Sequence, residues 1–285
     1  MIGSVVLVPH RERPSARETA RAAAAWLADA GIEVRMPEAE ASACGLPALG
    51  RSVPGLTDGA GLVVSIGGDG TMLSTVQLIY PAPVPVIGVN AGHLGYLSEL
   101  EPAGLIGALP RLAAGDFTVS ERMMIAVEVT PRGGPATTHY ALNEAVLERP
   151  RAGHTVRLDV TINRSPFTSY AADGVIVATP TGTTAYSFSA RGPIASPAMR
   201  CLVLTPLSPH MLFDRSLLLS DRESIELVVD GEAGAGLTVD GRDLGILGPG
   251  DRVACTAAPD PVRLATLAPR DFHQILKAKF ALPDR

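Results

Sequence analysis

Cysteine is scarce in this chain, and the few that occur form no recognisable pattern. The sequence holds three, Cys44, Cys201 and Cys255, an odd number without a CxxC pair. Small secreted domains and zinc modules instead carry even sets of cysteines at regular spacings. The six histidines likewise lack the HxH or HExxH spacing of a preformed transition-metal site. We therefore expect neither a disulfide framework nor a metal cage, and no metal-ligating residue can be assigned.

A large excess of positive charge and long apolar runs are also missing. The chain has 24 Lys and Arg against 29 Asp and Glu, a net charge of -5, so little positive charge is available to follow a nucleic-acid backbone. No apolar stretch approaches the roughly 20 residues that span a bilayer, and the start MIGSVVLVPH lacks a basic region and a cleavage site. We expect a cytoplasmic protein with neither a nucleic acid nor a membrane as its partner.

The first hundred residues alternate short apolar runs with helix-period segments, which is typical of βα units and a parallel sheet. The expected strands cover residues 4–8, 32–36, 62–66 and 86–89. Ser15 and Glu18 can form a capping box at the start of an Ala-rich helix that ends at Gly31, and another helix covers 72–79. Residues 37–60 have no clear period, so we expect a linker or mobile loop there.

From about Arg122 the pattern changes to alternation with period two, clearest over residues 156–162, which predicts antiparallel strands. Asp-Gly pairs favour tight turns in this half, although not all need be hairpins, and they stand at 173–174, 230–231 and 240–241. A last helix from Asp271 requires an apolar neighbour for one face, formed by Phe272, Ile275, Leu276 and Phe280. The sequence thus predicts two domains, one α/β and one rich in β strands.

One candidate site is a glycine-rich loop directly after an expected strand. Residues 62–66 run into Gly67-Gly68-Asp69-Gly70-Thr71 and then into a helix. Such a loop exposes backbone N–H groups that suit phosphate. A carboxylate among them repels a triphosphate unless it binds Mg²⁺ or accepts a proton from an attacking hydroxyl, which favours phosphoryl transfer. The alternative is a tight turn in which Asp69 only caps the helix at Met72.

Two further blocks carry polar groups next to buried strands. Asn143-Glu144 pairs an amide with a carboxylate, which suits base edges and ribose hydroxyls, although a solvated strand end explains it as well. Residues 172–187 form an apolar strand followed by a turn rich in hydroxyl groups with one aromatic ring, Tyr186. Taken alone, that turn is equally a β-turn with local Ser and Thr hydrogen bonds and a core tyrosine.

Together these blocks resemble the NAD kinase family. The resemblance rests on motifs that occur in order along the chain: GGDGT at 67–71, NAGHLGYL at 90–97, LNE at 142–144, DGVIVATPTGTTAYSFSA at 173–190, PH at 209–210 and VDGRDLG at 239–245. A loop similar to GGDGT also occurs in diacylglycerol and sphingosine kinases, whereas the 173–190 block is specific to the NAD kinase branch. The match covers nearly the whole chain.

The resemblance implies a Rossmann-like α/β domain over 1–121 plus 268–285, and a sandwich-like antiparallel β domain over 122–267. It also implies an active site between the domains and a last helix that returns to the first. The implied reaction transfers the γ-phosphoryl of ATP to the 2′-hydroxyl of the adenosine ribose of NAD⁺, giving NADP⁺ and ADP, with Mg²⁺ or Mn²⁺. Members of this family are commonly homodimers or homotetramers, and free edges of a β domain allow such pairing.

The same resemblance implies a role for each motif. Asp69 accepts the proton of the 2′-hydroxyl, while Gly68 and Gly70 accommodate phosphate. The residues implied to hold NAD⁺ are Asn143, Glu144, Asp173, Thr184, Ala185, Tyr186, Ser187, Ser189 and Asp240. Tyr186 is expected to act by stacking. His154 lies where the family often offers an imidazole or a basic group near the nucleotide, and a surface histidine is an equal alternative.

The chain departs from the family pattern at Thr183, Arg191 and Arg242. The two arginines are either added phosphate contacts or solvated side chains. A lipid kinase that shares the GGDGT loop is one alternative function, but the sequence shows no acyl pocket and no basic membrane-facing patch. A catalytically silent NAD(P)-binding sensor is the other alternative, and the intact GGDGT loop argues against it.

Overall fold

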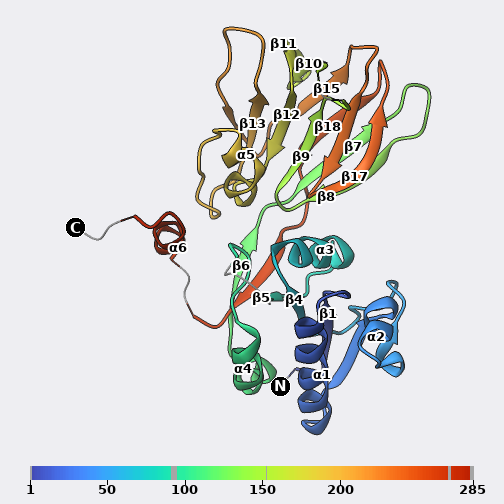
Figure 1. Cartoon of the computed structure of the whole chain (residues 1–285), viewed down its shortest axis with the longest axis vertical. Helices are drawn as coiled ribbons and strands as arrows, with labels where there is room; N and C mark the ends of the chain where they lie inside the picture. The colour runs from blue at the N-terminus through green and yellow to red at the C-terminus, as the bar shows by residue number, and fades with distance from the viewer. Residues whose placement is uncertain (1, 91–94, 152, 269–270, 283–285) are drawn as a thin grey trace. The chain divides into compact units, whose positions relative to one another are not determined.

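The computed structural model describes residues 2–90, 95–151, 153–268 and 271–282, so part of the NAGHLGYL motif, 91–94, lies outside the described residues. The chain divides into two compact units, Met1–Glu121 with Val262–Arg285 and Arg122–Pro261 (Figure 1). From the sequence, residues 262–267 were expected to belong to the second domain. In the structure Val262–Thr266 forms β19, which pairs with β5 (Val86–Asn90) of the first unit. The chain therefore returns to the first unit earlier than expected.

The centre of the first unit is a sheet with seven strands among the described residues. Their order is β3-β2-β1-β4-β5-β19-β6. The strands not yet given are β1 (Ser4–Pro9), β2 (Glu33–Pro37), β3 (Gly50–Arg51), β4 (Leu62–Gly67) and β6 (Thr118–Arg122). The pairs β1–β2, β1–β4 and β4–β5 are parallel, and every residue of β1, β4 and β5 is buried. A strand covered on both faces needs a largely apolar run, and the sequences of the three strands have one.

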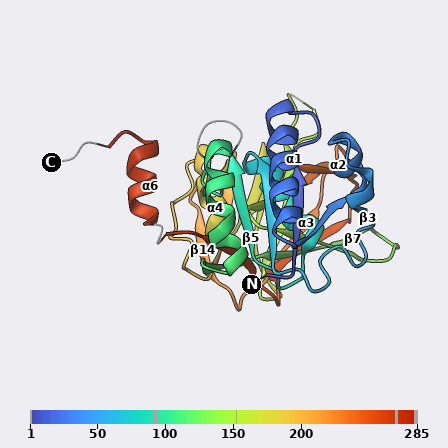
Figure 2. The same ribbon diagram turned by 90° about the horizontal axis from the view of Figure 1, so that it is seen from below.

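Helices cover this sheet, and α1 (Pro14–Asp29) and α4 (Pro102–Ala114) pack against each other beside it (Figure 2). The predicted capping box at Ser15 is wrong. The helix begins at Pro14, and Arg13 stands at the N-cap without a side-chain cap. Proline suits the first helical position because the N–H that it lacks would have no partner within the helix. The helix therefore starts one residue before Ser15.

The segment 37–60, expected to be a linker or mobile loop, contains regular structure. It holds α2 (Glu38–Ala43), a 3₁₀ turn η1 (Pro47–Leu49) and the edge strand β3, which pairs with β2. Ala41 and Cys44 are buried in the core of the first unit. These elements are too short to show a period in the sequence, because periodicity needs a window of about 11 residues.

The second unit consists of two antiparallel sheets, each with six strands among the described residues. One has the order β11-β10-β15-β18-β7-β8 and the other β14-β13-β12-β9-β16-β17. The first sheet contains β7 (Ile125–Thr130), β8 (Thr137–Ala141), β10 (Val156–Ile162), β11 (Ser165–Ala172), β15 (Ile225–Val229) and β18 (Arg252–Ala257). The second contains β9 (Glu144–Glu148), β12 (Gly174–Ala178), β13 (Cys201–Leu207), β14 (Leu217–Ser220), β16 (Ala235–Val239) and β17 (Arg242–Leu247). One apolar cluster draws on both sheets, so the unit is a sandwich as predicted.

Only one of the three Asp-Gly pairs forms a hairpin. Asp240 and Gly241 join β16 to β17, with φ angles of 48° and 76°, the left-handed values that a tight hairpin turn requires. The pairs at 173–174 and 230–231 instead lie where the chain passes between the sheets, from β11 to β12 and from β15 to β16. The Asp-Gly pattern therefore predicts a turn but not which strands it joins.

The last helix, α6 (Phe272–Lys279), belongs to the first unit, as the resemblance implied. Asp271 caps it by accepting hydrogen bonds from the N–H groups of His273 and Gln274. None of its residues is buried, whereas the sequence led us to expect one apolar face covered by a neighbour. The Lys279 ammonium lies 4.4 Å from the centre of the Tyr96 ring, a cation–π contact. Among the described helices, none has the length and apolar character to cross a bilayer.

Candidate functional site

The glycine-rich loop follows β4 at the edge of the sheet where the parallel strands β1 and β5 also end. Open parallel sheets bind their ligands beyond this edge. Gly67 has no space for a side chain, because a Cβ would lie 2.1 Å from Thr71 Oγ1. The helix α3 (Asp69–Ile79) starts at Asp69, and the Met72 N–H donates to the Gly68 carbonyl. Asp69 is therefore not a cap for Met72.

The Asp69 carboxylate is held by the segment 95–98, which follows β5. The Tyr96 N–H donates to Oδ2 at 2.9 Å, the Leu97 N–H to Oδ1 at 3.3 Å and the Ser98 hydroxyl to Oδ1 at 3.2 Å. A Cβ on Gly95 would lie 1.9 Å from Asp69 Oδ1, so this approach is possible only for glycine. The segment thus fixes the orientation of the carboxylate that the resemblance assigns as the base.

A pocket of about 520 Å³ lies beside the loop, within the first unit. Its lining includes His10, Arg11, Arg13, Gly68, Gly70 and Thr71. The Arg13 guanidinium is 3.8 Å from the point where a side chain on Gly68 would begin. Arg11 pairs with Glu40 at 3.6 Å. The lining also includes the carboxylates of Glu12 and Glu40, so its charged side chains are of both signs. The glycine backbone, the first turn of α3 and the Arg13 guanidinium are the parts of the pocket that suit an anionic ligand such as phosphate.

In the second unit, three segments far apart in the sequence meet at Asn143. The Thr179 N–H donates to the Asn143 carbonyl at 2.8 Å, and the Thr179 hydroxyl donates to the Leu142 carbonyl at 2.5 Å. A Cβ on Gly182 would lie 2.1 Å from the Asn143 carbonyl oxygen. From the hairpin, Asp240 accepts hydrogen bonds from the N–H groups of this strand end. The structure thus brings the LNE, TPTG and VDG motifs together.

Glu144 has an unusual electrostatic environment. Burial, and then the negative charge of Asp240, raise the pKa of Glu144 to about 8, and a hydrogen bond from the Tyr186 backbone acts in the opposite direction. Its Oε2 atom is buried without a hydrogen-bond partner within the described part of the chain. At neutral pH Glu144 is therefore an uncharged acid with unused hydrogen-bonding capacity, so this is not a solvated strand end.

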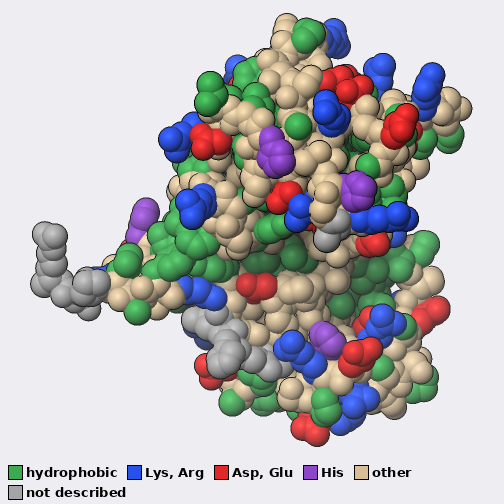
Figure 3. All heavy atoms as spheres, turned by 45° about the horizontal axis from the view of Figure 1, so that its top comes forward, with side chains coloured by type: hydrophobic (Ala, Val, Ile, Leu, Met, Phe, Trp, Pro, Cys, Tyr) green, Lys and Arg blue, Asp and Glu red, His purple; other side chains and the backbone are tan. Residues whose placement is uncertain are grey.

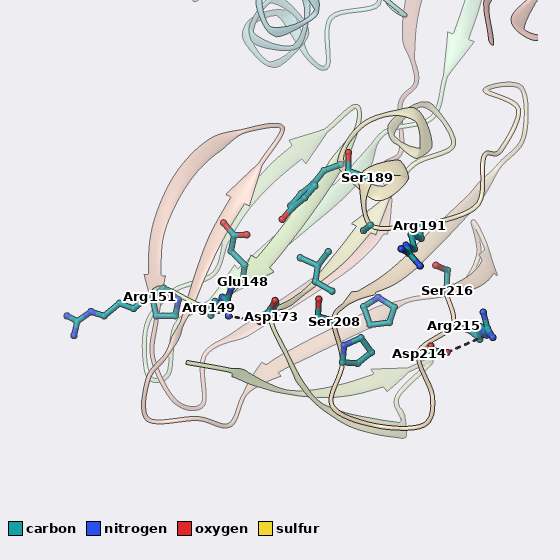
Figure 4. A pocket seen from close by; sticks show the side chains of 16 residues that line it. Glu148, Arg149, Arg151, Asp173, Ser189, Arg191, Ser208, Asp214, Arg215 and Ser216 are labelled. Carbon is teal, nitrogen blue, oxygen red and sulfur yellow. Dashed lines mark ion pairs between the residues drawn. The ribbon is translucent and has the colours of Figure 1, made fainter. Parts of the chain in front are cut away.

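A second pocket, of about 710 Å³, lies in the second unit at the other end of β9 (Figure 4). Its lining includes Glu148, Arg149, Asp173, Tyr186, Ser189 and Arg191. Arg149 and Asp173 form an ion pair of 2.7 Å. Burial, and then the charge of Glu148, raise the pKa of Tyr186. The pocket offers an aromatic ring, hydroxyl groups and charges of both signs, which fits the polar and aromatic parts of a dinucleotide.

The remaining predicted residues are divided between these places and others. Thr184 is the last residue of the 3₁₀ turn η2 (Thr181–Thr184), and Ala185 joins this turn to α5 (Tyr186–Ser189). Tyr186 and Ser189 of α5 line the pocket. Ser187 is buried, and its hydroxyl pairs with that of Thr205 at 3.2 Å, so it supports the turn from within. His154 is exposed in the loop after β9 and is not among the pocket-lining residues.

The two arginines that depart from the family pattern have different surroundings. Arg191 lines the pocket of Figure 4, with a left-handed φ of 62°. Arg242 is exposed at the start of β17, and after burial its charge is the second cause that lowers the pKa of His139. On the face shown in Figure 3, Lys and Arg side chains are scattered among Asp and Glu side chains.

Several residues of these sites were not predicted from the sequence. Arg13 follows β1 and Tyr96 to Ser98 follow β5, so the rule that ligands bind at the carboxyl edge of a parallel sheet would have found them. Glu148 and Arg149 stand at the far end of the strand that Glu144 begins. No local pattern marks them, because they reach Asp173 and Tyr186 only through the pairing of β9 with β12.

Comparison with known proteins gives one consistent result. The ATP-NAD kinase N-terminal domain matches residues 52–117, and the ATP-NAD kinase C-terminal domain matches residues 142–267. The NAD kinase of Moorella thermoacetica is 38% identical over 274 residues, which cover 96% of this chain and 88% of that protein. The chain is also 37% identical to NAD kinase 2 of Streptomyces coelicolor over 287 residues, with 99% and 95% of the two chains covered.

Solved structures agree on the fold. The yeast NADH kinase complexed with NADH superposes with a TM-score of 0.91 at 23% identity, covering 100% of this chain and 89% of that one. The two domain models and the relatives, which match over nearly the full length of the chain, all point to the same family. The chain belongs to the ATP-NAD kinase family.

Proposed function

We propose that this protein transfers the γ-phosphoryl of ATP to the 2′-hydroxyl of the adenosine ribose of NAD⁺, with NADP⁺ and ADP as products. The observation that carries the proposal is the 38% identity to an NAD kinase over 96% of the chain. The chemistry of the two units supports it. One unit offers a carboxylate in a glycine-rich loop beside a pocket lined by Arg13 and glycine backbone, and the other offers polar and aromatic groups around Asn143 and Tyr186.

In this proposal Asp69 is the general base. The 2′-hydroxyl gives its proton to the Asp69 carboxylate as the ribose oxygen forms a bond to the γ-phosphorus, and the bond from that phosphorus to the bridging oxygen of ADP breaks. Asp69 accepts three hydrogen bonds from residues 96–98. The weaker of these, from Leu97 and Ser98 at 3.3 and 3.2 Å, are the ones that an incoming hydroxyl would most easily replace at Oδ1.

The dinucleotide would bind in the second unit. Asn143 and Glu144 would hold the adenosine portion, because a buried amide and a neutral carboxylic acid can pair with base edges and ribose hydroxyls. Tyr186 is 41% exposed, which leaves its ring free to stack on a base. Asp173 and Ser189 line the 710 Å³ pocket together with Tyr186 and would contact the rest of the dinucleotide.

The donor phosphates would bind in the pocket of the first unit. Arg13 and Arg11 supply positive charge there, and Gly68 and Gly70 let phosphate oxygens approach the backbone. These residues act by binding and orientation, and most catalysis of phosphoryl transfer is of that kind. His154 would contribute only if its loop approached the nucleotide.

A divalent cation, Mg²⁺ or Mn²⁺, would accompany the donor. No group of three or more His, Cys, Asp or Glu that could hold a metal exists among the described residues, so the donor set fits a cation carried mainly by phosphate oxygens rather than a protein cage. Asp69 is the carboxylate of the loop that could add a ligand. When bound, such a cation neutralises charge on the transferred phosphoryl group.

We also propose that the protein is a homo-oligomer, a dimer or a tetramer. β14 and β17 are the two edges of one sheet of the second unit. Leu218 on β14 is 51% exposed and Ile246 on β17 is 69% exposed. Apolar side chains on open strand edges favour pairing with another copy. Light scattering on the purified protein tests this, and a mass equal to one chain of 29.6 kDa would contradict it.

The test of the reaction is NADP⁺ formation from NAD⁺, ATP and Mg²⁺ by the wild-type protein and by Asp69→Asn. We expect turnover in the wild type and a fall of at least about a hundredfold in the variant, the usual contribution of a general base, with NAD⁺ binding retained in calorimetry. Asp29→Asn, at an exposed position on α1, is the matched control. NAD⁺ binding without any NADP⁺ from ATP or polyphosphate would instead establish a silent sensor, and turnover of a lipid alcohol would establish a lipid kinase.

A further inference from the structure

The carboxylate of Asp240 is bound to the backbone rather than directed at open space. Oδ2 accepts the Leu142 N–H at 2.7 Å, and Oδ1 accepts the N–H groups of Asn143 at 2.8 Å and Glu144 at 3.1 Å. In the reverse direction the Asp240 N–H donates to the Glu144 carbonyl at 3.0 Å. A carboxylate offers about four acceptor positions, so these contacts with three successive residues take most of its capacity.

The hairpin explains how Asp240 reaches this place. β16 pairs with β9 in the register Val239 with Ala145, so the next residue of the hairpin lies opposite Glu144. The left-handed conformation of Asp240 and Gly241 then ends β16 abruptly and turns the chain into β17. β16 has ended at this point, and the Asp240 side chain provides the acceptors for the N–H groups of the residues that enter β9.

We propose that Asp240 is a positioning residue that holds the backbone of Asn143 and Glu144 in the geometry needed to bind NAD⁺, and that it does not contact NAD⁺ itself. The inference rests on the proposed function, in which Asn143 and Glu144 hold the adenosine portion. It changes the role that the resemblance implied for Asp240, because a carboxylate engaged with three backbone amides is poorly available to a ligand.

Asp240 also sets the charge state of the site. β9 is flanked by β12 (GVIVA) and β16 (AGLTV), and neither strand has a titratable side chain. The groups that act on Glu144 are the Asp240 carboxylate, which disfavours a second negative charge, and the Tyr186 backbone amide, which favours it. Because burial and Asp240 raise the pKa of Glu144 to about 8, loss of the Asp240 charge would allow Glu144 to ionise at lower pH.

Two substitutions separate position from charge. Asp240→Asn removes the charge, so the pH at which NAD⁺ affinity changes, near 8 in the wild type, should move to lower pH, and Kd at pH 7 should rise at least tenfold. Asp240→Glu keeps the charge but lengthens the side chain, so Kd should rise while that pH stays where it is. Asp230→Asn alters the exposed Asp-Gly pair between the sheets and should change neither. Calorimetry from pH 6.5 to 9 measures both quantities.

Amide hydrogen exchange on the ligand-free full chain gives a readout that does not depend on NAD⁺. Amides 142–144 should exchange at least tenfold faster in Asp240→Asn than in the wild type and in Asp230→Asn. If Asp240→Asn does not fold, as judged by circular dichroism, the Kd for NAD⁺ and the exchange of amides 142–144 are measured on Asp240→Glu instead. Wild-type Kd and exchange in the folded variants would overturn the proposal, as would faster exchange with unchanged Kd and pH profile. Absence of NAD⁺ binding by the wild type would instead overturn the proposed function.

Discussion

Two carboxyl groups in this chain, one in each unit, have opposite local environments. Asp69 accepts hydrogen bonds from the backbone N–H groups of Tyr96 and Leu97 and from the Ser98 hydroxyl, which fix the orientation of its carboxylate. Glu144 is buried beside Asp240 and retains its proton up to about pH 8. In the proposed function the two carboxyl groups have different roles, Asp69 as the proton acceptor and Glu144 as a hydrogen-bond donor to the nucleotide.

Gly95→Ala tests the support of Asp69. The added methyl would stand 1.9 Å from Asp69 Oδ1, so either the carboxylate or the segment 95–98 must move. We expect kcat to fall by about a hundredfold, because displacement of a catalytic group by an ångström has effects of that size, while Kd for NAD⁺ stays the same. Gly107→Ala is the control, since a Cβ there meets nothing within 4 Å. Wild-type kcat for Gly95→Ala would show that the position of Asp69 is not critical.

Glu144 makes stability depend on pH. Its pKa is about 8 in the folded chain against 4.5 as the ordinary value, so between these values the folded state holds a proton that the unfolded state has lost. The contribution of Glu144 to the free energy of unfolding is therefore highest below pH 4.5. It falls as the pH rises from 4.5 to 8, by roughly 1.4 kcal/mol per pH unit. Urea unfolding of ligand-free protein should show this loss, and Glu144→Gln should reduce its slope. Glu232→Gln, in an exposed loop, should leave the slope unchanged.

At the scale of elements, the connection between β1 and α1 is the least expected part of the site. Pro14 starts α1 directly after Arg13, so the pocket residues 10–13 form a short, tightly defined turn. The turn lies at the edge of the sheet where β4 ends and Gly68 follows. A fixed turn can hold Arg13 near the glycine loop before any ligand arrives, which lowers the entropy lost on binding.

Arg13→Leu tests this turn as the donor phosphate site. Loss of one charged hydrogen bond to phosphate should raise KM for ATP by about tenfold to a hundredfold, and Kd for NAD⁺ should be unchanged. Arg17→Leu, one helical turn further along α1 and outside the pocket lining, is the matched control. Equal effects of the two substitutions would mean that only overall charge matters.

Most of the elements could be predicted from the sequence, and the failures have physical causes. The buried strands β1, β4 and β5 were evident because largely apolar runs of this length have few other uses. α2 and β3 were not predicted because they are too short to show a hydrophobic period in the sequence. In the site, Asp69 and Tyr186 stand in recognisable motifs, whereas Arg149 and Ser98 acquire their partners only through sheet pairing and a loop after β5.

At the scale of the whole molecule, each unit has its own apolar core. The fragment 122–261 should therefore fold alone and bind NAD⁺ without forming NADP⁺, because Asp69 belongs to the other unit. Circular dichroism should show a β-rich spectrum with cooperative unfolding, and calorimetry should detect NAD⁺ binding that Tyr186→Ala weakens. A fragment that unfolds, or that folds without binding NAD⁺, would mean that the second unit depends on the first.

The strands β6 and β19 give the chain an engineering property. They are neighbours in the sheet, and Thr118 contacts Thr266 while Arg263 pairs with Glu121 at 3.5 Å, so they run in opposite directions. The point where the chain leaves the first unit is thus about one strand spacing, roughly 4.8 Å, from the point where it re-enters. Residues 122–261 form an insertion with adjacent ends. We expect that residues 122–261 can be exchanged for the corresponding residues of a relative while the sheet of the first unit stays intact.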